Sequence, residues 1–325
     1  MQKKKVLVTG GAGYIGSVLS RLLLDKGYQV RVVDCLFWGK EPLQGVTSHL
    51  NYEFKEGDIR DSQIYEEIFK DVDGIVHLAA IVGDPACKAN PDLATEINWE
   101  ASKALFDYAQ KVGVERFVFA STCSNYGKMS DPNGYVDETC ALNPVSLYAK
   151  LKVQFEEYLL GAPRKGMTAT PLRFSTAYGP SERMRFDLTV NEFVKEVVLG
   201  RELIVFGEQF WRPYCHTQDL ADACLSVLEA EKDCIDRSVF NVGDIKENYQ
   251  KKMIVDLIQE RIPEMKVRFV KKDEDPRDYR VNFQKIRSVL GYQVQHRLPD
   301  GISELVGILE DGKIKNPDDK IYCNV

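Results

Sequence analysis

Residues 5–17 read KVLVTGGAGYIGS, and the rest of the chain is organised around this stretch. The apolar run Val6–Val8 predicts a buried parallel strand, and apolar residues at helical spacing follow. Between them stand Gly10, Gly13 and Gly16, which suit a tight turn that a pyrophosphate can approach closely. The helix N-terminus then offers free N–H groups to phosphate. The spacing is GxxGxxG rather than GxGxxG, so a plain turn between strand and helix is the alternative.

A second apolar run supports the dinucleotide interpretation. It ends in Asp34, about 20 residues beyond the glycines, where an acidic residue binds the ribose hydroxyls of adenosine. A carboxylate at this place also repels a 2′-phosphate, so it favours NAD over NADP. An aspartate in an ordinary turn at the end of a strand is the alternative reading. With the glycines in register, we expect an NAD site.

Composition narrows the class of protein. The 325 residues suffice for one large domain or two, and 44% hydrophobic with 28% charged residues is ordinary for a globular protein. A net charge of −6 argues against a general nucleic-acid binder. No apolar run approaches the ~20 residues of a membrane span, and no signal-peptide pattern precedes the first strand. The eight cysteines form no CxxC pair and only four histidines occur, so we expect free thiols in a reducing cytosol and no metal site.

Strands and helices alternate over the first half of the chain. Further strands are predicted over 52–56, 74–80, 114–120 and 169–174, with helices over 93–112 and after Ser146. This alternation predicts an α/β fold with a doubly wound parallel sheet of the Rossmann type. A later run, 240–243, is expected to return to the sheet as a strand. We expect His77 to be a packed strand residue, Asp61 to cap a helix, and the charged tail from Asp311 to be peripheral.

Two groups of polar residues are candidates for chemistry. The cluster STCSNYG at 121–127 follows a predicted strand, where α/β sheets hold their active sites. Tyr148 and Lys152 are four residues apart and share a helix face, where a cation lowers the pKa of a tyrosine and prepares it as a general base. Surface neighbours at the same spacing are the common alternative. Arginines in or beside loops of this acidic chain indicate a bound anion, namely Arg183, Arg185, Arg212, Arg277 and Arg280.

These motifs together resemble a known family. TGGAGYIGS, Asp34, GDIRD, HLAA, STCSNYG and YAKLK occur in the order found in the extended short-chain dehydrogenases/reductases, the NAD-dependent nucleotide-sugar epimerase/dehydratase group. The resemblance extends to about Leu309. The segments SERMRFDLTVN and EDPRDYRV are similar to a subgroup that includes GDP-heptose 4-dehydrogenases. Thr176 stands where the family commonly has asparagine, which leaves open how the phosphates are held there.

The resemblance implies a role for each matching position. Tyr148 would be the catalytic acid/base, Lys152 would lower its pKa and hold the nicotinamide ribose, and Thr122 would bond the reacting hydroxyl. The implied cofactor-binding residues, besides Tyr148 and Lys152, are Gly10, Gly13, Tyr14, Ile15, Gly16, Asp34, Asp58, Ile59, Leu78, Ala79, Ala80 and Asn98. The implied substrate-binding residues are Thr122, Cys123, Ser124, Thr176, Arg185, Asn191, Arg212 and Arg277.

The implied reaction is oxidation of a nucleotide sugar at C4. Tyr148 would take the hydroxyl proton, hydride would pass to NAD, and a 4-keto sugar would form. We expect 4-epimerisation, with 4-dehydrogenation as the alternative and an inactive NAD-binding sensor as the rival from another class. Family 4,6-dehydratases carry Asp and Glu after the catalytic Thr, whereas this chain has Cys123 and Ser124 there, so elimination of water is not expected. For elimination to occur, Asp84 or Asp187 would have to supply the missing carboxylate from a distant loop.

The resemblance also implies the organisation of the molecule. The NAD-binding Rossmann domain is expected over 1–176 with 214–242, and a smaller nucleotide-sugar-binding domain over 177–213 with 243–325. A cytoplasmic homodimer is expected, paired through the helices over 93–112 and 148–160. Apolar residues on these helices suit either an interface or a core, namely Leu105, Phe106, Phe155 and Leu159.

Overall fold

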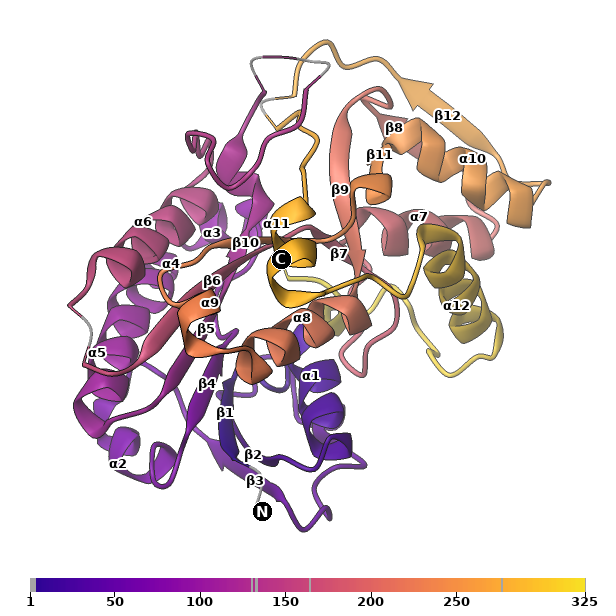
Figure 1. The fold of residues 1–325 in the computed structure, drawn as a ribbon. Helices are drawn as coiled ribbons and strands as arrows, with labels where there is room; N and C mark the ends of the chain where they lie inside the picture. The colour runs from indigo at the N-terminus through magenta and orange to yellow at the C-terminus, as the bar shows by residue number, and fades with distance from the viewer. Residues whose placement is uncertain (1–3, 130, 132–133, 164, 276, 325) are drawn as a thin grey trace.

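A seven-stranded parallel sheet forms the centre of the computed structural model, which describes residues 4–129, 131, 134–163, 165–275 and 277–324. The strand order is β10-β6-β5-β4-β1-β2-β3 (Figure 1), and every neighbouring pair is parallel. Its strands are β1 (Lys5–Thr9), β2 (Gln29–Asp34), β3 (Tyr52–Glu56), β4 (Gly74–His77), β5 (Arg116–Thr122), β6 (Thr168–Phe174) and β10 (Phe240–Val242). The predicted doubly wound sheet, including the returning strand over 240–243, is confirmed.

Helices cover both faces of this sheet because successive strand residues point to opposite sides. Along β1, Val6 and Val8 pack into one core cluster and Leu7 into another. The first cluster is covered mainly by α1 (Tyr14–Asp25), α8 (Thr217–Glu229), α9 (Lys232–Ile235) and α11 (Gln284–Leu290), the second by α2 (Tyr65–Ile68), α5 (Ser102–Val112) and α6 (Leu147–Gly161).

The expected single helix over 93–112 is divided. After α3 (Asp84–Ala89), the chain forms α4 (Pro91–Thr95), a π-helical turn over Glu96–Ala101 and then α5. Such turns often occur at functional sites, and this one carries Asn98. Leu105 and Phe106 of α5 and Phe155 and Leu159 of α6, which suited an interface or a core in the sequence, are all fully buried in the second core cluster.

A smaller C-terminal domain packs against the carboxyl end of the sheet. It contains two further sheets and the helices α7 (Thr189–Val198), α10 (Lys251–Arg261) and α12 (Leu298–Glu310) around a third core cluster. The strands of these sheets are β7 (Thr176–Tyr178), β8 (Leu203–Phe206), β9 (Trp211–His216), β11 (Asn248–Gln250) and β12 (Val267–Val270). The later segment 279–294 packs on the first core cluster of the large sheet through residues such as Tyr279 and Phe283.

The tail expected to be peripheral is mostly exposed as far as Ile321, but residues 322–324 are partly buried. Beyond α12 it runs back toward the middle of the molecule (Figure 1). There it contacts the loop that carries Arg183, Arg185 and Asp187. Hydrogen bonds at long sequence separation, which local patterns do not encode, hold it there. Within the described residues, no helix has the length and apolar character needed to cross a membrane.

Candidate active site

The glycine turn between β1 and α1 is closed to side chains. Gly10 has φ +74°, and a Cβ added to it would lie 2.7 Å from the backbone nitrogen of Ala79. Ala79 lies just beyond β4, in the run Leu78–Ala80 that follows His77, so the turn and this segment form one surface. A turn without side chains beside a helix N-terminus fits a pyrophosphate.

Asp34 lies beside this turn at the end of β2. Its carboxylate accepts the N–H of Ala12 at 2.9 Å and that of Leu36 at 2.8 Å. Burial raises the pKa of Asp34, whereas the two N–H groups lower it. Leu36 has φ +55°, a conformation that costs energy for a residue other than glycine and is typical of functional sites. The turn and the carboxylate therefore fit the adenosine diphosphate half of NAD.

Asp58 and Ile59, the residues expected near the adenine, have different surroundings. Asp58 forms a forked ion pair with Arg60, which lowers the pKa of Asp58. Ile59 is buried and its carbonyl accepts the hydroxyl of Tyr65 at 2.7 Å. Asp61 accepts the N–H of Gln63 at 2.9 Å, so the predicted cap is confirmed.

Asn98 supports the segment after β4. Its amide Nδ2 donates to the carbonyl of Ile81 at 2.9 Å, and its Oδ1 accepts the N–H of the same residue at 2.8 Å. His77, at the end of β4, is buried between Thr9 Oγ1 (2.7 Å) and Ser102 Oγ (2.9 Å). The expectation of a packed strand residue is thus confirmed for His77.

Tyr148 and Lys152 begin the helix α6, whose N-cap is Ser146. Lys152 Nζ donates to the carbonyl of Ala120 at 2.9 Å and lies 5.8 Å from the centroid of the Tyr148 ring. Burial lowers the pKa of Lys152 to about 8. Burial raises the pKa of Tyr148 above 10, and the positive charge of Arg185 opposes this rise. In the protein without NAD the effect of burial on the Tyr148 pKa thus exceeds that of Arg185, and a lowering of this pKa by Lys152 stays a prediction.

Thr122 and Cys123, two neighbours in the polar cluster at 121–127, have different surroundings. Thr122 Oγ1 accepts the N–H of Ser124 at 3.1 Å, which leaves the threonine hydroxyl hydrogen free to donate. Cys123, by contrast, is 1% exposed and its thiol donates to the carbonyl of Arg173 at 3.2 Å. Cys123 thus lies in the core beneath the edge of the sheet, away from the surface on which a substrate would rest.

The two arginines expected to bind a diphosphate meet at one carboxylate. Arg212 Nη2 lies 2.9 Å from Asp275 Oδ1, and Arg277 Nε lies 3.7 Å from the same oxygen. Arg277 Nη1 also reaches Asp84, at the start of α3, at 2.7 Å. Tyr279 is buried beneath Arg212, whose guanidinium lies 5.3 Å from the ring centroid. The C-terminal domain therefore brings two cations to the edge of the large sheet.

The sequence reasoning missed Asp275 and Tyr279. Both belong to the quoted motif DPRDYR, so an acidic and an aromatic residue within two positions of an expected anion-binding arginine were the available signal.

Arg185 is held by a neighbouring carboxylate. Its Nε and Nη2 atoms bond the two oxygens of Asp187 at 2.9 and 2.6 Å. Asn191 is fully buried, and its amide bonds the carbonyl of Arg185 (2.8 Å), the hydroxyl of Tyr14 (2.9 Å) and the N–H of Gly179 (3.1 Å). Asn191 and Tyr14 therefore lie in the joint between the glycine-turn helix and the C-terminal domain, with no free polar atom on the amide.

The remaining expected residues take part in packing and pairing. Ile15 packs partly buried against the first core cluster, and Thr176 pairs with Tyr214 between β7 and β9.

One cluster has the composition of a metal site. Among the described residues, His216, Asp219 and His296 each bring one possible ligand atom within 4.8 Å of the others. The two imidazole rings stack with centroids 4.4 Å apart and planes 20° apart, so their in-plane lone pairs lie in separate, nearly parallel planes, which does not suit joint binding of one ion. His216 Nδ1 already accepts the Gln218 N–H, and its Nε2 lies 2.9 Å from Glu304 Oε2.

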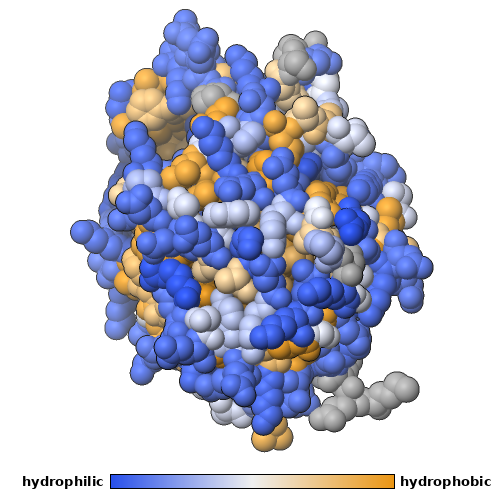
Figure 2. Space-filling view, turned by 90° about the vertical axis from the view of Figure 1, so that its left-hand side faces the viewer, coloured by the Kyte–Doolittle hydropathy of each residue, from blue (hydrophilic) through white to orange (hydrophobic). Residues whose placement is uncertain are grey.

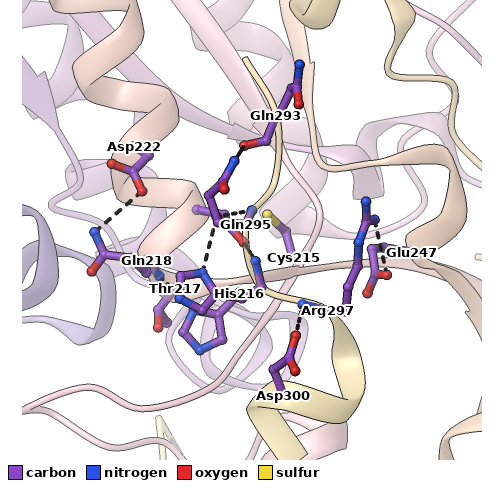
Figure 3. A network of polar contacts seen from close by, with 12 residues as sticks. Cys215, His216, Thr217, Gln218, Asp222, Glu247, Gln293, Gln295, Arg297 and Asp300 are labelled. Atoms are coloured by element: carbon purple, nitrogen blue, oxygen red, sulfur yellow. Dashed lines mark hydrogen bonds and ion pairs between the residues drawn. The ribbon is translucent and has the colours of Figure 1, made fainter.

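This cluster belongs to a larger polar network between α8 and α12. Figure 3 shows Gln218 reaching Asp222 on one side and Arg297 reaching Glu247 on the other. Both carboxylate oxygens of Asp219 accept N–H groups from the segment 295–296. These contacts join the two domains. The predicted absence of a metal site stays a prediction.

Comparisons with known proteins agree with this arrangement. The model of the NAD-dependent epimerase/dehydratase family matches residues 6–243. A putative UDP-glucose 4-epimerase of Methanocaldococcus jannaschii is 29% identical over 315 residues, which are 94% of this chain and 98% of that protein.

Solved structures share the whole architecture. The UDP-glucose 4-epimerase of Thermotoga maritima, crystallised with UDP-glucose, has a TM-score of 0.83 at 28% identity, covering 95% of this chain and 99% of the other. The UDP-glucuronic acid 4-epimerase of Bacillus cereus, in complex with UDP-glucuronic acid and NAD, has a TM-score of 0.84 at 25% identity, covering 94% and 99%. The chain is thus an enzyme that uses NAD and belongs to the NAD-dependent epimerase/dehydratase family.

Proposed function

We propose that this enzyme is a nucleotide-sugar 4-epimerase that acts on a UDP-sugar through a 4-keto intermediate. The observation that carries the proposal is the set of Thr122, Tyr148 and Lys152 at the carboxyl edge of the sheet, with no carboxylate at the two positions after Thr122. The UDP-sugar epimerases among its relatives support the choice of nucleotide.

In the proposed mechanism, Tyr148 takes the proton from the C4 hydroxyl and later returns it. Thr122 keeps its hydroxyl hydrogen free and orients the reacting group. Lys152, Asp34 and the glycine turn would hold the cofactor. When bound, NAD supplies the hydride acceptor and donor and, in its oxidised form, a positive ring charge. Arg185 adds a positive charge of the protein itself that favours the phenolate of Tyr148.

The substrate diphosphate is proposed to bind Arg212 and Arg277. Both are paired with carboxylates here, Asp275 and Asp84 respectively. Phosphate oxygens match the guanidinium fork as well as a carboxylate does. The diphosphate would therefore take the place of Asp84 on Arg277, while Asp275, which is buried, keeps the two arginines together.

The sugar is proposed to be neutral. A ring carboxylate beside Tyr148 needs a cation, and Arg185 is already bound at two points by Asp187. A uronate would have to break this pair and leave Asp187 without its partner. The pairing of Asp187 with Arg185 also argues against elimination of water, because this carboxylate is not free to act as a base on the sugar.

A product panel tests the proposal. The enzyme is incubated with NAD and, separately, with UDP-glucose, UDP-N-acetylglucosamine, UDP-glucuronic acid and GDP-mannose, and products are weighed and examined by proton NMR at C4. We expect an isobaric product of inverted C4 configuration from a neutral UDP-sugar. Loss of water would show a dehydratase, and loss of two hydrogens with stoichiometric NADH would show a dehydrogenase. No turnover of any nucleotide sugar would favour an NAD-binding sensor.

The organisation of the molecule remains part of the proposal. We assign NAD binding to residues 1–176 with 214–242 and substrate binding to 177–213 with 243–325. A cytoplasmic location suits the eight free cysteines. Cell fractionation with an antibody to the protein tests the location.

We further propose a homodimer formed through α5 and α6. Because the apolar residues first considered are buried, we assign the contact to three partly exposed aromatic residues: Trp99 in the π-helical turn before α5, Tyr108 on α5 and Tyr158 on α6. Figure 2 shows the side of the molecule where these helices lie, with apolar groups scattered among hydrophilic ones. Sedimentation at micromolar concentration should give the mass of two chains, and a Trp99→Glu variant should give the mass of one.

A further inference from the structure

The tail beyond α12 is anchored at two points before it reaches the site. Asp318 forms ion pairs with Lys195 (2.9 Å) and Arg201, near the end of α7. Tyr322 packs on the third core cluster, and its ring lies 5.6 Å from that of Phe186. These anchors leave little freedom to the residues 322–324 that follow.

Three successive tail residues then hold the loop 183–187. The N–H of Phe186 donates to the carbonyl of Tyr322 at 2.8 Å. Arg183 Nη2 donates to the carbonyl of Cys323 at 3.4 Å, and the N–H of Asn324 donates to Asp187 Oδ2 at 3.3 Å. This is the carboxylate oxygen that also binds Arg185 Nη2. The position of the Arg185 guanidinium is therefore fixed by Asp187, and that of Asp187 partly by the tail.

Asn324 also reaches the large sheet. Its Nδ2 donates to the carbonyl of Val82 at 3.2 Å, two residues beyond the segment Leu78–Ala80 that faces the glycine turn. Because Asn324 touches Val82 on one side and Asp187 on the other, it bridges the two domains at the site. Its Oδ1 is buried and has no partner among the described residues, which leaves an acceptor for a ligand or an ordered water.

From these contacts we propose that residues 322–324 are a positioning strap of the active site: they fix the Arg183–Asp187 loop, and with it the guanidinium of Arg185, relative to the large domain, whose helix α6 carries Tyr148. The strap acts through Arg185 and is not itself catalytic. The role given to Tyr148 rests on the proposed function. The placement of the loop by the strap does not depend on it.

The test compares Asn324→Pro, which removes the N–H bonded to Asp187, and Tyr322→Ala, which removes the ring anchor, with the control Lys313→Ala. Lys313 is exposed and pairs only with Asp311 within the tail. In the NAD-loaded enzyme, hydrogen–deuterium exchange at the Phe186 amide should be about tenfold faster or more in both strap variants and unchanged in the control. Wild-type exchange rates in both strap variants would overturn the proposal.

A second measurement distinguishes a strap that positions Arg185 from one that only supports the fold. Cys87, Asp84 and Tyr279 also act on Tyr148 and raise its pKa, whereas Arg185 lowers it. With a substrate from the product panel, the acid limb of the kcat–pH profile should therefore move upward by about half to one unit in the strap variants, because a displaced Arg185 no longer favours the phenolate. A lower kcat with an unmoved profile would overturn the positioning role. If the wild type turns over no nucleotide sugar, the proposed function fails, and the exchange measurement still decides whether the strap fixes the loop.

Discussion

A buried ion pair beneath the candidate active site offers a sharp test of how the site is supported. Glu156 lies on α6 on the same face as Tyr148 and Lys152, two and one helical turns further on. Its carboxylate bonds the guanidinium of Arg173 on β6 and accepts the hydroxyl of Ser121 at 2.8 Å. Glu156 and Arg173 are 1% and 4% exposed, so neither charge is solvated.

The expected loss of unfolding free energy follows from this burial. Among the described residues, Glu156→Ala leaves the buried Arg173 guanidinium with its bond to Tyr126 alone. Removing one partner of such a buried pair costs about 3–5 kcal/mol of unfolding free energy. Glu156→Gln keeps a hydrogen-bond acceptor and should cost about half as much. The double variant Glu156→Leu/Arg173→Met removes both charges and should return to within about 1–2 kcal/mol of wild type.

The assay is urea unfolding followed by fluorescence and circular dichroism, with all variants at the same NAD concentration. Glu157→Ala is the matched control, because Glu157 is the exposed neighbour on the same helix and should change stability by less than about 0.5 kcal/mol. A cost below about 1 kcal/mol for Glu156→Ala, or a double variant no more stable than the single one, would refute the reasoning that an uncompensated charge dominates.

Three further predictions concern single residues. Tyr148→Phe should lower kcat by about 10³-fold or more while NAD binding, measured by calorimetry, is unchanged, and the control Tyr158→Phe on the same helix should stay active; a Tyr148→Phe enzyme with most of its kcat would exclude the acid/base role. Asp34→Ala should narrow the preference for NAD over NADP about tenfold in competitive titrations, and tighter NADP binding by the wild type would contradict the assignment. Burial lowers the pKa of His77 from 6.5 to about 3, so between these values the unfolded chain binds a proton that the native chain does not. Stability should therefore fall as pH falls through this window, by about 2–3 kcal/mol at pH 4.5, and His77→Gln should remove most of this dependence in urea unfolding at pH 7 and 4.5; an equally pH-sensitive variant would point to other groups.

The local elements of the fold were readable from the sequence because their causes are local. Strand runs such as Val6–Val8, the glycines that follow, and Asp34 one strand further on depend on side-chain pattern and backbone freedom over a few residues. The helix that begins after Ser146 and the shared face of Tyr148 and Lys152 follow from local sequence and helix geometry in the same way. For these residues the structure added distances to an arrangement already expected.

Tertiary structure alone decided the state of the site. The pKa of Tyr148 depends on burial and on charges from other segments, such as Arg185, which a rule for two residues on one helix does not include. The pairing of Arg212 with Asp275, and the joint made by Asn191, require segments far apart in the chain to meet. The tail carries no motif, yet Asn324 reaches Val82 across 242 residues because the packing of α12 and Tyr322 leads it there. Local pattern specifies which elements form, whereas burial and long-range contacts specify what each charged group faces.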